Sequence, residues 1–330
     1  MLQVPEDVFP LALLYLRIYL AGMPVILLYN FEAAIFRSVG ETKIPLVALA
    51  VSGVLNVALN LFFVAVLGMT VNGVAIATVI SNAVSAALLY VRLRRTAREV
   101  RLDPKRLRID GAILGRILRI GLPAGLQSAV FAFSNIVIQA AINSLGTVVM
   151  AASSAAYNIE IITYDILNSF SQACTTFVGQ NSGAGQVGRC RRTLALCLME
   201  GALALAGAIA VILLFGKPLL TLFNSDPEVV ETGYIRLMMV MISHSFSLLY
   251  EIMAGYLRGF GISLAPALLT MVGVCGVRIG WIQWVFPRSR TFSTIMTAYP
   301  ISLSVTALLI FAALLWCHPA KRSEEKREKV

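Results

Sequence analysis

The chain has 330 residues, of which 58% are hydrophobic and only 13% are charged, and its mean hydropathy is +0.82. Because about a quarter of the residues of a soluble globular domain are charged, this composition excludes an ordinary soluble protein and indicates one that lies in a membrane. The net charge of +10 does not indicate nucleic-acid binding, because the basic residues lie in short links beside apolar stretches and not along a basic surface.

Nine stretches are long and apolar enough to cross the hydrocarbon core, which takes about 20 helical residues. Only helices and closed barrels can span a bilayer, and the sequence lacks the alternating pattern of barrel strands. The sequence therefore predicts an all-α polytopic membrane protein with helices over 11–36, 46–67, 73–92, 118–142, 148–178, 193–215, 234–256, 264–286 and 294–316.

Polar segments divide these helices into two parts. We expect three helices in residues 1–92, a basic cytoplasmic linker over 93–117, six helices in 118–318, and a solvated cytoplasmic tail over 319–330. Counted alternately along the nine spans, one side of the membrane carries 21 Lys and Arg residues and the other carries three. By the positive-inside rule the basic side is cytoplasmic, which places the C-terminus there.

The two parts are related by an internal repeat at a fixed offset of 221 residues. Tyr29, Arg37, Gly40, Ala77 and Ser81 recur as Tyr250, Arg258, Gly261, Ala298 and Ser302, and Tyr15-Leu16-Arg17 matches Tyr234-Ile235-Arg236 with a shift of two residues. Such self-similarity indicates two related halves. The counterparts of 112–222 would precede the first residue, so we expect about three N-terminal helices to be missing from a twelve-helix, two-lobe protein with a six-helix repeat.

Two neighbouring predicted helices carry polar stripes. In 118–142 the polar residues recur at multiples of four, as Gln127, Asn135 and Gln139. In 148–178 the polar residues fall within an arc of about 120° when each residue turns by about 100°, and they include Asn158, Tyr164, Asp165, Asn168 and Gln172. Amides and carboxylates are costly against lipid. A polar seam between helices is one interpretation, but so many polar groups fit a water-filled cavity better.

Two acids in this region are candidates for ion coupling. Asp165 lies near the middle of its predicted helix and on the polar arc, and Glu160 is equally deep but lies at the margin of the arc. A buried carboxylate can alternate between protonated and cation-bound states, as a carrier coupled to H⁺ or Na⁺ requires. The alternative is a structural role as an ion-pair or hydrogen-bond partner.

Further charged residues lie inside the spans. Glu32 with Arg37, and Glu251 with Arg258, lie near the cytoplasmic ends of repeat-related helices; a gate between the halves or simple interfacial snorkelling would explain them. Their spacings of five and seven residues do not favour local pairs. His244 is expected to be a buried histidine with satisfied ring nitrogens, the alternative being a proton relay.

Neither a metal nor a bound cofactor is expected. The five cysteines are scattered without a CxxC pair, and the two histidines are far apart. The string Gly183–Gly188 fits GxGxxG, but it follows a long apolar helix instead of a strand, so it indicates a helix end. A nucleophile constellation of Ser and His, or a pair of Asp residues, is also missing, so the protein is not expected to be an enzyme.

Several motifs resemble those of the multidrug and toxin extrusion (MATE) family, over essentially residues 8–316. They are Tyr15-Leu16-Arg17-Ile18, the Arg37-Ser38-Val39-Gly40 turn leading to Pro45, Gly121-Leu122-Pro123, the Gly-Gln-Asn-Ser-Gly-Ala element of 179–184, and Leu257-Arg258-Gly259-Phe260-Gly261. The resemblance implies two six-helix lobes around a central cavity, with helices 4–6 of the first lobe and 7–12 of the second present here.

The resemblance also implies a function. It is export of organic, often cationic, small molecules in exchange for H⁺ or Na⁺ by alternating access, in a monomeric multi-pass protein of the cell membrane. The alternatives are a lipid-linked oligosaccharide flippase or polysaccharide exporter of the same broad fold, which would need a strongly cationic cavity, and an inactive truncated remnant.

Overall fold

The computed structural model describes residues 9–96 and 100–320, and within these ranges every regular element is helical. The long helices are α1 (Phe9–Ser38), α2 (Lys43–Leu61) with a π-helical end η1 (Phe62–Val66), α3 (Val71–Arg95), α4 (Gly111–Asn143), α5 (Thr147–Gly183), α6 (Val187–Thr221), α7 (Pro227–Gly259), α8 (Leu264–Thr270), η3 (Met271–Gly276) and α9 (Val277–Trp284) in one run, and α10 (Phe292–Cys317). Two short 3₁₀ turns complete the set, η2 (Pro104–Arg106) and η4 (Phe286–Arg288).

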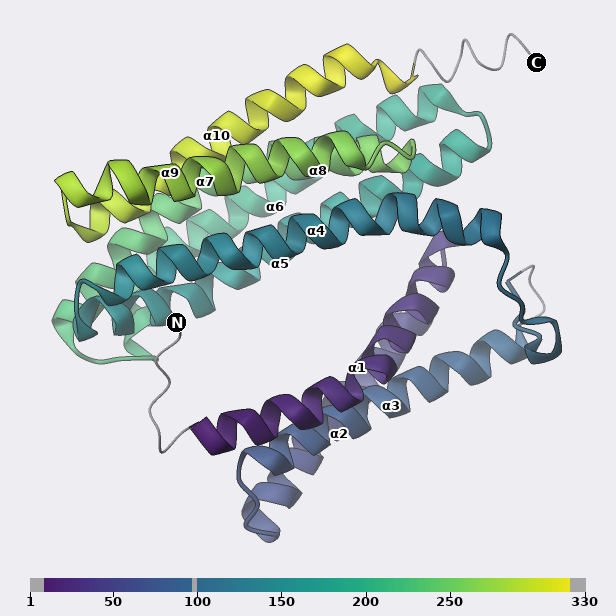
Figure 1. Ribbon diagram of the computed structural model, residues 1–330, viewed down its shortest axis with the longest axis horizontal. Coiled ribbons are helices and arrows are strands. Elements are labelled where there is room, and N and C mark those ends of the chain that lie inside the picture. The colour runs from purple at the N-terminus through teal and green to yellow at the C-terminus, as the bar shows by residue number, and fades with distance from the viewer. Residues whose placement is uncertain (1–8, 97–99, 321–330) are drawn as a thin grey trace. The chain divides into compact units, whose positions relative to one another are not determined.

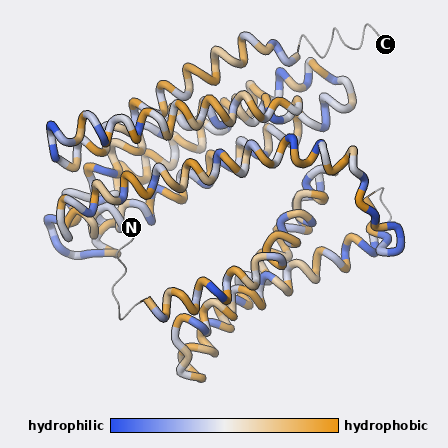
Figure 2. Tube along the Cα trace, viewed as in Figure 1, coloured by the Kyte–Doolittle hydropathy of each residue, from blue (hydrophilic) through white to orange (hydrophobic). Residues whose placement is uncertain are grey.

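The predicted all-α membrane fold is confirmed, because each of the nine apolar stretches coincides with a helical run (Figure 1). Eight of these runs are long and apolar enough to cross a membrane, and α5, which carries the polar arc, is the ninth. Figure 2 shows the helices as mainly hydrophobic, with a hydrophilic segment between α3 and α4. Both α3 and α4 extend into the predicted linker; its residues 97–99, and 321–330 of the predicted tail, lie outside the described residues.

The chain divides into two compact units, unit 1 up to Ile109 and unit 2 from Asp110. In unit 1, α1 and α2 pack on α3, and the core contains Ala33, Phe36, Ala48, Leu89 and Leu93. In unit 2, α7 is the most extensively buried candidate span and lies against α5, α6 and α10. Burying one helix on several sides makes it the natural place for polar groups that must be kept from lipid.

Helices α5 and α7 approach each other closely because small residues line their contact. A methyl group added at Gly255 would lie 2.6 Å from the backbone oxygen of Ser171. At this crossing the Ser171 hydroxyl donates to the backbone oxygen of Glu251 (2.8 Å), and the Thr175 hydroxyl donates to that of Gly255 (3.0 Å). Small residues and interhelical hydrogen bonds are what hold helices together in lipid, where the hydrophobic effect between them is weak.

The structure supports the internal repeat at the helix ends. Gly40 and Gly261 follow α1 and α7 with the same φ of +79°, a conformation that glycine adopts without strain. The bonds that close the two ends also correspond. Glu41 N–H donates to the oxygen of Phe36 (3.0 Å), and Ile262 N–H donates to that of Leu257 (3.0 Å). The two helices therefore end in the same way, 221 residues apart.

Candidate functional site

The most deeply buried ionic contact in unit 2 joins α5 to α7. The Arg236 Nε donates to Glu160 Oε2 (3.0 Å), Nη2 donates to Glu160 Oε1, and Nη1 donates to the Ser153 hydroxyl (2.6 Å). All three side chains are buried, at 2–6% exposure. Two parallel bonds between a guanidinium and a carboxylate are the strong geometry for such a pair. Glu160 is therefore buried, and its carboxylate already has a partner.

Aromatic rings and a second arginine adjoin this pair. The guanidinium of Arg236 lies over the rings of Tyr157 (5.7 Å) and Tyr299 (5.9 Å), and that of Arg278 lies over Tyr299 at 4.2 Å. Arg278, in α9, also donates from Nε to the Ser302 hydroxyl (3.1 Å) in α10. Cations are attracted to aromatic faces at these distances. Residues of α5, α7, α9 and α10 thus form one buried group, which we call the arginine cluster: Ser153, Tyr157, Glu160, Arg236, Arg278, Tyr299 and Ser302.

His244 is buried beside the arginine cluster, near Glu160 and Arg278. The expectation that its ring nitrogens are satisfied is wrong: neither has a hydrogen-bond partner among the described residues. The hydroxyl of the adjacent Ser243 bonds back to the Met239 oxygen (2.5 Å). A polar ring left without partners in a buried position is costly, which makes it a functional candidate.

The predicted polar arc of α5 lies mostly on the surface of unit 2. Asp165, Asn158, Tyr164 and Gln172 are exposed and Asn168 is half-buried. Within the helix, the Asn158 amide donates to the Ser154 oxygen (2.9 Å). Asp165 has no ion pair with any described residue. A carboxylate on the open face of a membrane helix needs water or another protein surface, as a cavity would provide.

The stripe of α4 is similarly placed. Asn135 and Gln139 are exposed and Gln127 is half-buried, and the Gln139 amide donates to Asn143 Oδ1 (2.7 Å) one turn further on. Within the described part of the chain, hydrogen bonds do not link this stripe to the arc of α5.

The two predicted gate pairs behave differently. Glu251 and Arg258 contact each other at 3.6 Å along α7, and Arg258 Nη2 donates to the Ser171 hydroxyl (3.0 Å). The expectation that seven residues is a poor spacing is wrong here, because seven residues complete nearly two turns and return to the same face. Tyr164 of the polar arc also interacts with Glu251, so α5 and α7 share this second polar group.

Glu32 and Arg37 form no ion pair in the described residues. Five residues turn a helix by about 140° beyond a full turn, so the two side chains leave on different faces. Glu32 is buried in unit 1 at 4% exposure, and neither of its carboxylate oxygens has a hydrogen-bond partner among the described residues. Arg37 is half-buried and interacts with Tyr29.

A polar group between α2 and α3 of unit 1 was not predicted from the sequence. The Ser52 hydroxyl donates to the Ser81 oxygen (2.8 Å), Asn56 Nδ2 donates to the Ser81 hydroxyl (3.2 Å), and Asn60 Nδ2 donates to Asn56 Oδ1 (3.0 Å). The signal was present in the sequence as two asparagines four residues apart in an apolar helix. Such a spacing places both side chains on one face.

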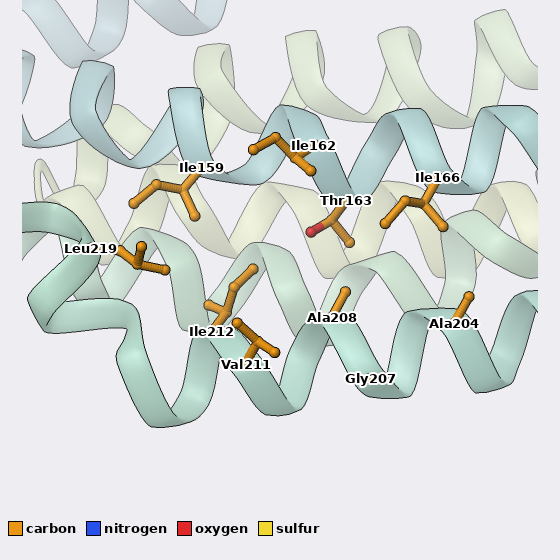
Figure 3. A pocket seen from close by; sticks show the side chains of 10 residues that line it. All are labelled: Ile159, Ile162, Thr163, Ile166, Ala204, Gly207, Ala208, Val211, Ile212 and Leu219. Carbon is orange, nitrogen blue, oxygen red and sulfur yellow. The ribbon is translucent and has the colours of Figure 1, made fainter.

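A cavity of about 320 Å³ between α5 and α6 is apolar. Figure 3 shows the side chains that line it, which are aliphatic apart from Thr163. It is lined by Ile159, Ile162, Thr163, Ile166, Ala204, Gly207, Ala208, Val211, Ile212 and Leu219. The predicted polar residues do not line it. The described residues also contain no group of three or more His, Cys, Asp or Glu side chains that could hold a metal ion.

Fold and site together define a class of protein. A multi-pass helical membrane protein with an internal repeat, and with ionisable side chains buried inside its spans, has the architecture of secondary transporters.

The comparisons with known proteins identify the family. The MatE family model matches residues 1–62 and 123–282, so the chain belongs to the MatE (multidrug and toxin extrusion) family. It is similar to the probable multidrug resistance protein NorM of Chromobacterium violaceum, at 28% identity over 325 residues that cover 94% of this chain and 69% of that protein. It is also similar to the FAD transporter of Shewanella oneidensis, at 27% identity over 68% of this chain and 51% of that protein.

A solved structure shows the same fold. A MOP-superfamily transporter from Pyrococcus furiosus superposes with a TM-score of 0.87 at 21% identity, over 98% of this chain and 72% of that one. This likeness shows a shared fold. The family model and the transporter relatives place the chain among membrane transporters and not among enzymes, as predicted.

Proposed function

We propose that this chain forms the greater part of a secondary antiporter that exports organic small molecules in exchange for H⁺ or Na⁺. The proposal rests mainly on the position of Asp165. Its carboxylate lies within the hydrophobic length of α5, is exposed on the polar face of unit 2 and has no ion pair among the described residues. A coupling group must be able to exchange its cation. Asp165 is free to do so, whereas the Glu160 carboxylate is held by Arg236.

The other polar residues have roles that follow from their positions. Asn158, Tyr164, Asn168 and Gln172 of α5, with Gln127, Asn135 and Gln139 of α4, line the substrate cavity. Glu160 serves as the anchor for Arg236. Glu251 and Arg258, with Glu32 and Arg37 on the repeat-related helix, lie near the cytoplasmic ends and take part in gating. In this arrangement the protein is a monomer of the cell membrane. The 21 to 3 asymmetry in basic residues supports a cytoplasmic C-terminus.

Vesicle transport tests this function. The chain is produced in cells, everted membrane vesicles are prepared, and ethidium accumulation is followed with a proton gradient alone and with a sodium gradient alone. We expect one of the two gradients to drive accumulation above the level of vesicles that lack the protein. Equal accumulation with and without both gradients would contradict the antiport proposal.

A flippase for lipid-linked sugars is the second candidate. The two buried arginines of the arginine cluster are the observation that favours it, because pyrophosphate-linked substrates need cationic sites. The exposed polar arc carries an acid and amides instead, which is why antiport of small solutes is the preferred function.

A further inference from the structure

Unit 2 buries two guanidinium groups but only one carboxylate beside them. Each of the three guanidinium nitrogens of Arg236 donates a hydrogen bond, two to Glu160 and one to Ser153. Arg278 is 6% exposed, and Ser302 is its only hydrogen-bond partner among the described residues. Arg278 also has no ion pair with any described residue. A cation inside a membrane protein without a counter-ion is costly, so its retention points to a ligand.

The groups around Arg278 do not supply the missing negative charge. Tyr299 and Ser302 of α10 and Tyr250 of α7 are neutral, and His244 and Arg236 of α7 are neutral or cationic. Glu160 of α5 is already held by two bonds from Arg236. The cluster therefore carries at least one excess positive charge, and protonation of His244 would increase it.

The repeat shows that this contact does not need a charge for packing. Ser81 and Ser302 are repeat-related, and each donates its hydroxyl to the backbone oxygen three residues earlier, at 3.0 Å in both units. In unit 1 the serine accepts a bond from a neutral amide, Asn56 Nδ2 (3.2 Å), whereas in unit 2 it accepts one from Arg278 Nε (3.1 Å). In unit 1 a neutral amide is enough to make the interhelical hydrogen bond to the serine. The positive charge of Arg278 in unit 2 is therefore not needed for that contact and points to another role.

We propose that Arg278 binds the acidic group, carboxylate or phosphate, of an anionic solute or lipid headgroup. The two terminal nitrogens of its guanidinium have no partner among the described residues, and their planar fork matches the two oxygens of such a group. The cluster extends to the surface of unit 2 through Tyr157, whose side chain is 50% exposed. The proposal rests on the proposed transport function and adds to it a binding site for solutes or lipids that carry an acidic group.

Equilibrium binding of two xanthene dyes of opposite charge tests this site. The full chain is placed in phosphatidylcholine nanodiscs, and fluorescence anisotropy is used to titrate carboxyfluorescein, which is anionic, and rhodamine 123, which is cationic. We expect the wild type to bind carboxyfluorescein. Arg278→Gln should weaken this binding by at least about ten-fold, the loss of one charge-assisted hydrogen-bonded pair, and should not weaken binding of rhodamine 123.

Two further variants separate charge from folding. Arg278→Lys keeps the charge and should retain binding within about three-fold, because only the bidentate geometry is lost. Arg288→Gln removes the same charge from the exposed end of the neighbouring turn and should change nothing. Binding of rhodamine 123 alone by the wild type, binding of carboxyfluorescein by Arg278→Gln within about two-fold of wild type, or an equal loss for both dyes would overturn the proposal.

Lipid composition distinguishes the two sources of the acidic group. Replacing part of the phosphatidylcholine by phosphatidylglycerol should weaken carboxyfluorescein binding only if a lipid headgroup competes for Arg278, and that competition should vanish in Arg278→Gln. Unchanged binding assigns the site to a solute. Since binding and not transport is measured, loss of the site would leave ion-driven export of ethidium standing.

Discussion

Replacement of Asp165 by asparagine is expected to reduce ion-driven export to the level of vesicles without the protein, while the variant still inserts into the membrane. Asparagine has nearly the same size and can hydrogen-bond, but it cannot exchange a proton or bind a cation by charge. Asp165 lies on the exposed face of α5 and makes no ion pair in the described structure, so its loss should not disturb packing. Everted vesicles under the effective gradient supply the measurement.

The control for this variant makes the same chemical change elsewhere. Asp226 caps α7 by accepting from Glu228 N–H (2.9 Å), and asparagine is an equally good cap. Asp226→Asn should therefore export normally. Wild-type rates of gradient-driven export by Asp165→Asn, at equal protein levels, would remove Asp165 from the mechanism.

Replacement of Arg236 by methionine is expected to destabilise unit 2 by about 3–5 kcal/mol, the usual cost of leaving one member of a buried ion pair behind. The variant would leave the Glu160 carboxylate buried between α5 and α7 without its partner. The double variant Arg236→Met with Glu160→Gln removes both charges, so much of the lost stability should return. Unfolding of the purified protein in detergent, followed by helical circular dichroism, gives the difference in free energy between the variants.

Two stability results would contradict the buried ion pair between Glu160 and Arg236. If Arg236→Met lowers stability by less than about 1 kcal/mol, as an exposed pair would, or if the double variant is as unstable as the two single changes added together, Glu160 and Arg236 do not form the buried pair described here.

Much of the fold could be predicted because the membrane imposes it. Spans of about 20 apolar residues admit only helices, and these were found where the hydrophobicity placed them. Local signals were equally reliable: the glycine-rich string at 183–188 was interpreted as a helix end, and α5 ends at Gly183. These features depend on a few neighbouring residues, so a single sequence carries them.

The partners of the buried charges could not be predicted. Glu160 and Arg236 are 76 residues apart, and their contact depends on how α5 and α7 are rotated against each other. Hydrophobic pattern constrains that rotation weakly when both helices are apolar on several sides. For the same reason His244 was assigned hydrogen bonds that the described residues do not contain.

The internal repeat allows the buried polar groups of the two units to be compared position by position. Ser81 and Ser302 occupy corresponding positions, and the helices before them present an amide in one unit and a guanidinium in the other. Arg17, the counterpart of Arg236, is exposed in unit 1, whereas Arg236 is buried against α5. The two units therefore share their helix ends and packing, and they differ in the charges that they bury.

Ion movement driven by a dye gradient is the decisive test of whether the protein exchanges organic solute for H⁺ or Na⁺. The full chain is reconstituted in liposomes, an outward gradient of the exported dye is imposed without any ion gradient, and internal pH and sodium are recorded. Because coupling between two ligands acts equally in both directions, the dye gradient alone should drive H⁺ or Na⁺ into the liposomes. Asp165→Asn should abolish this ion movement. Dye efflux with no accompanying movement of either ion would contradict the account.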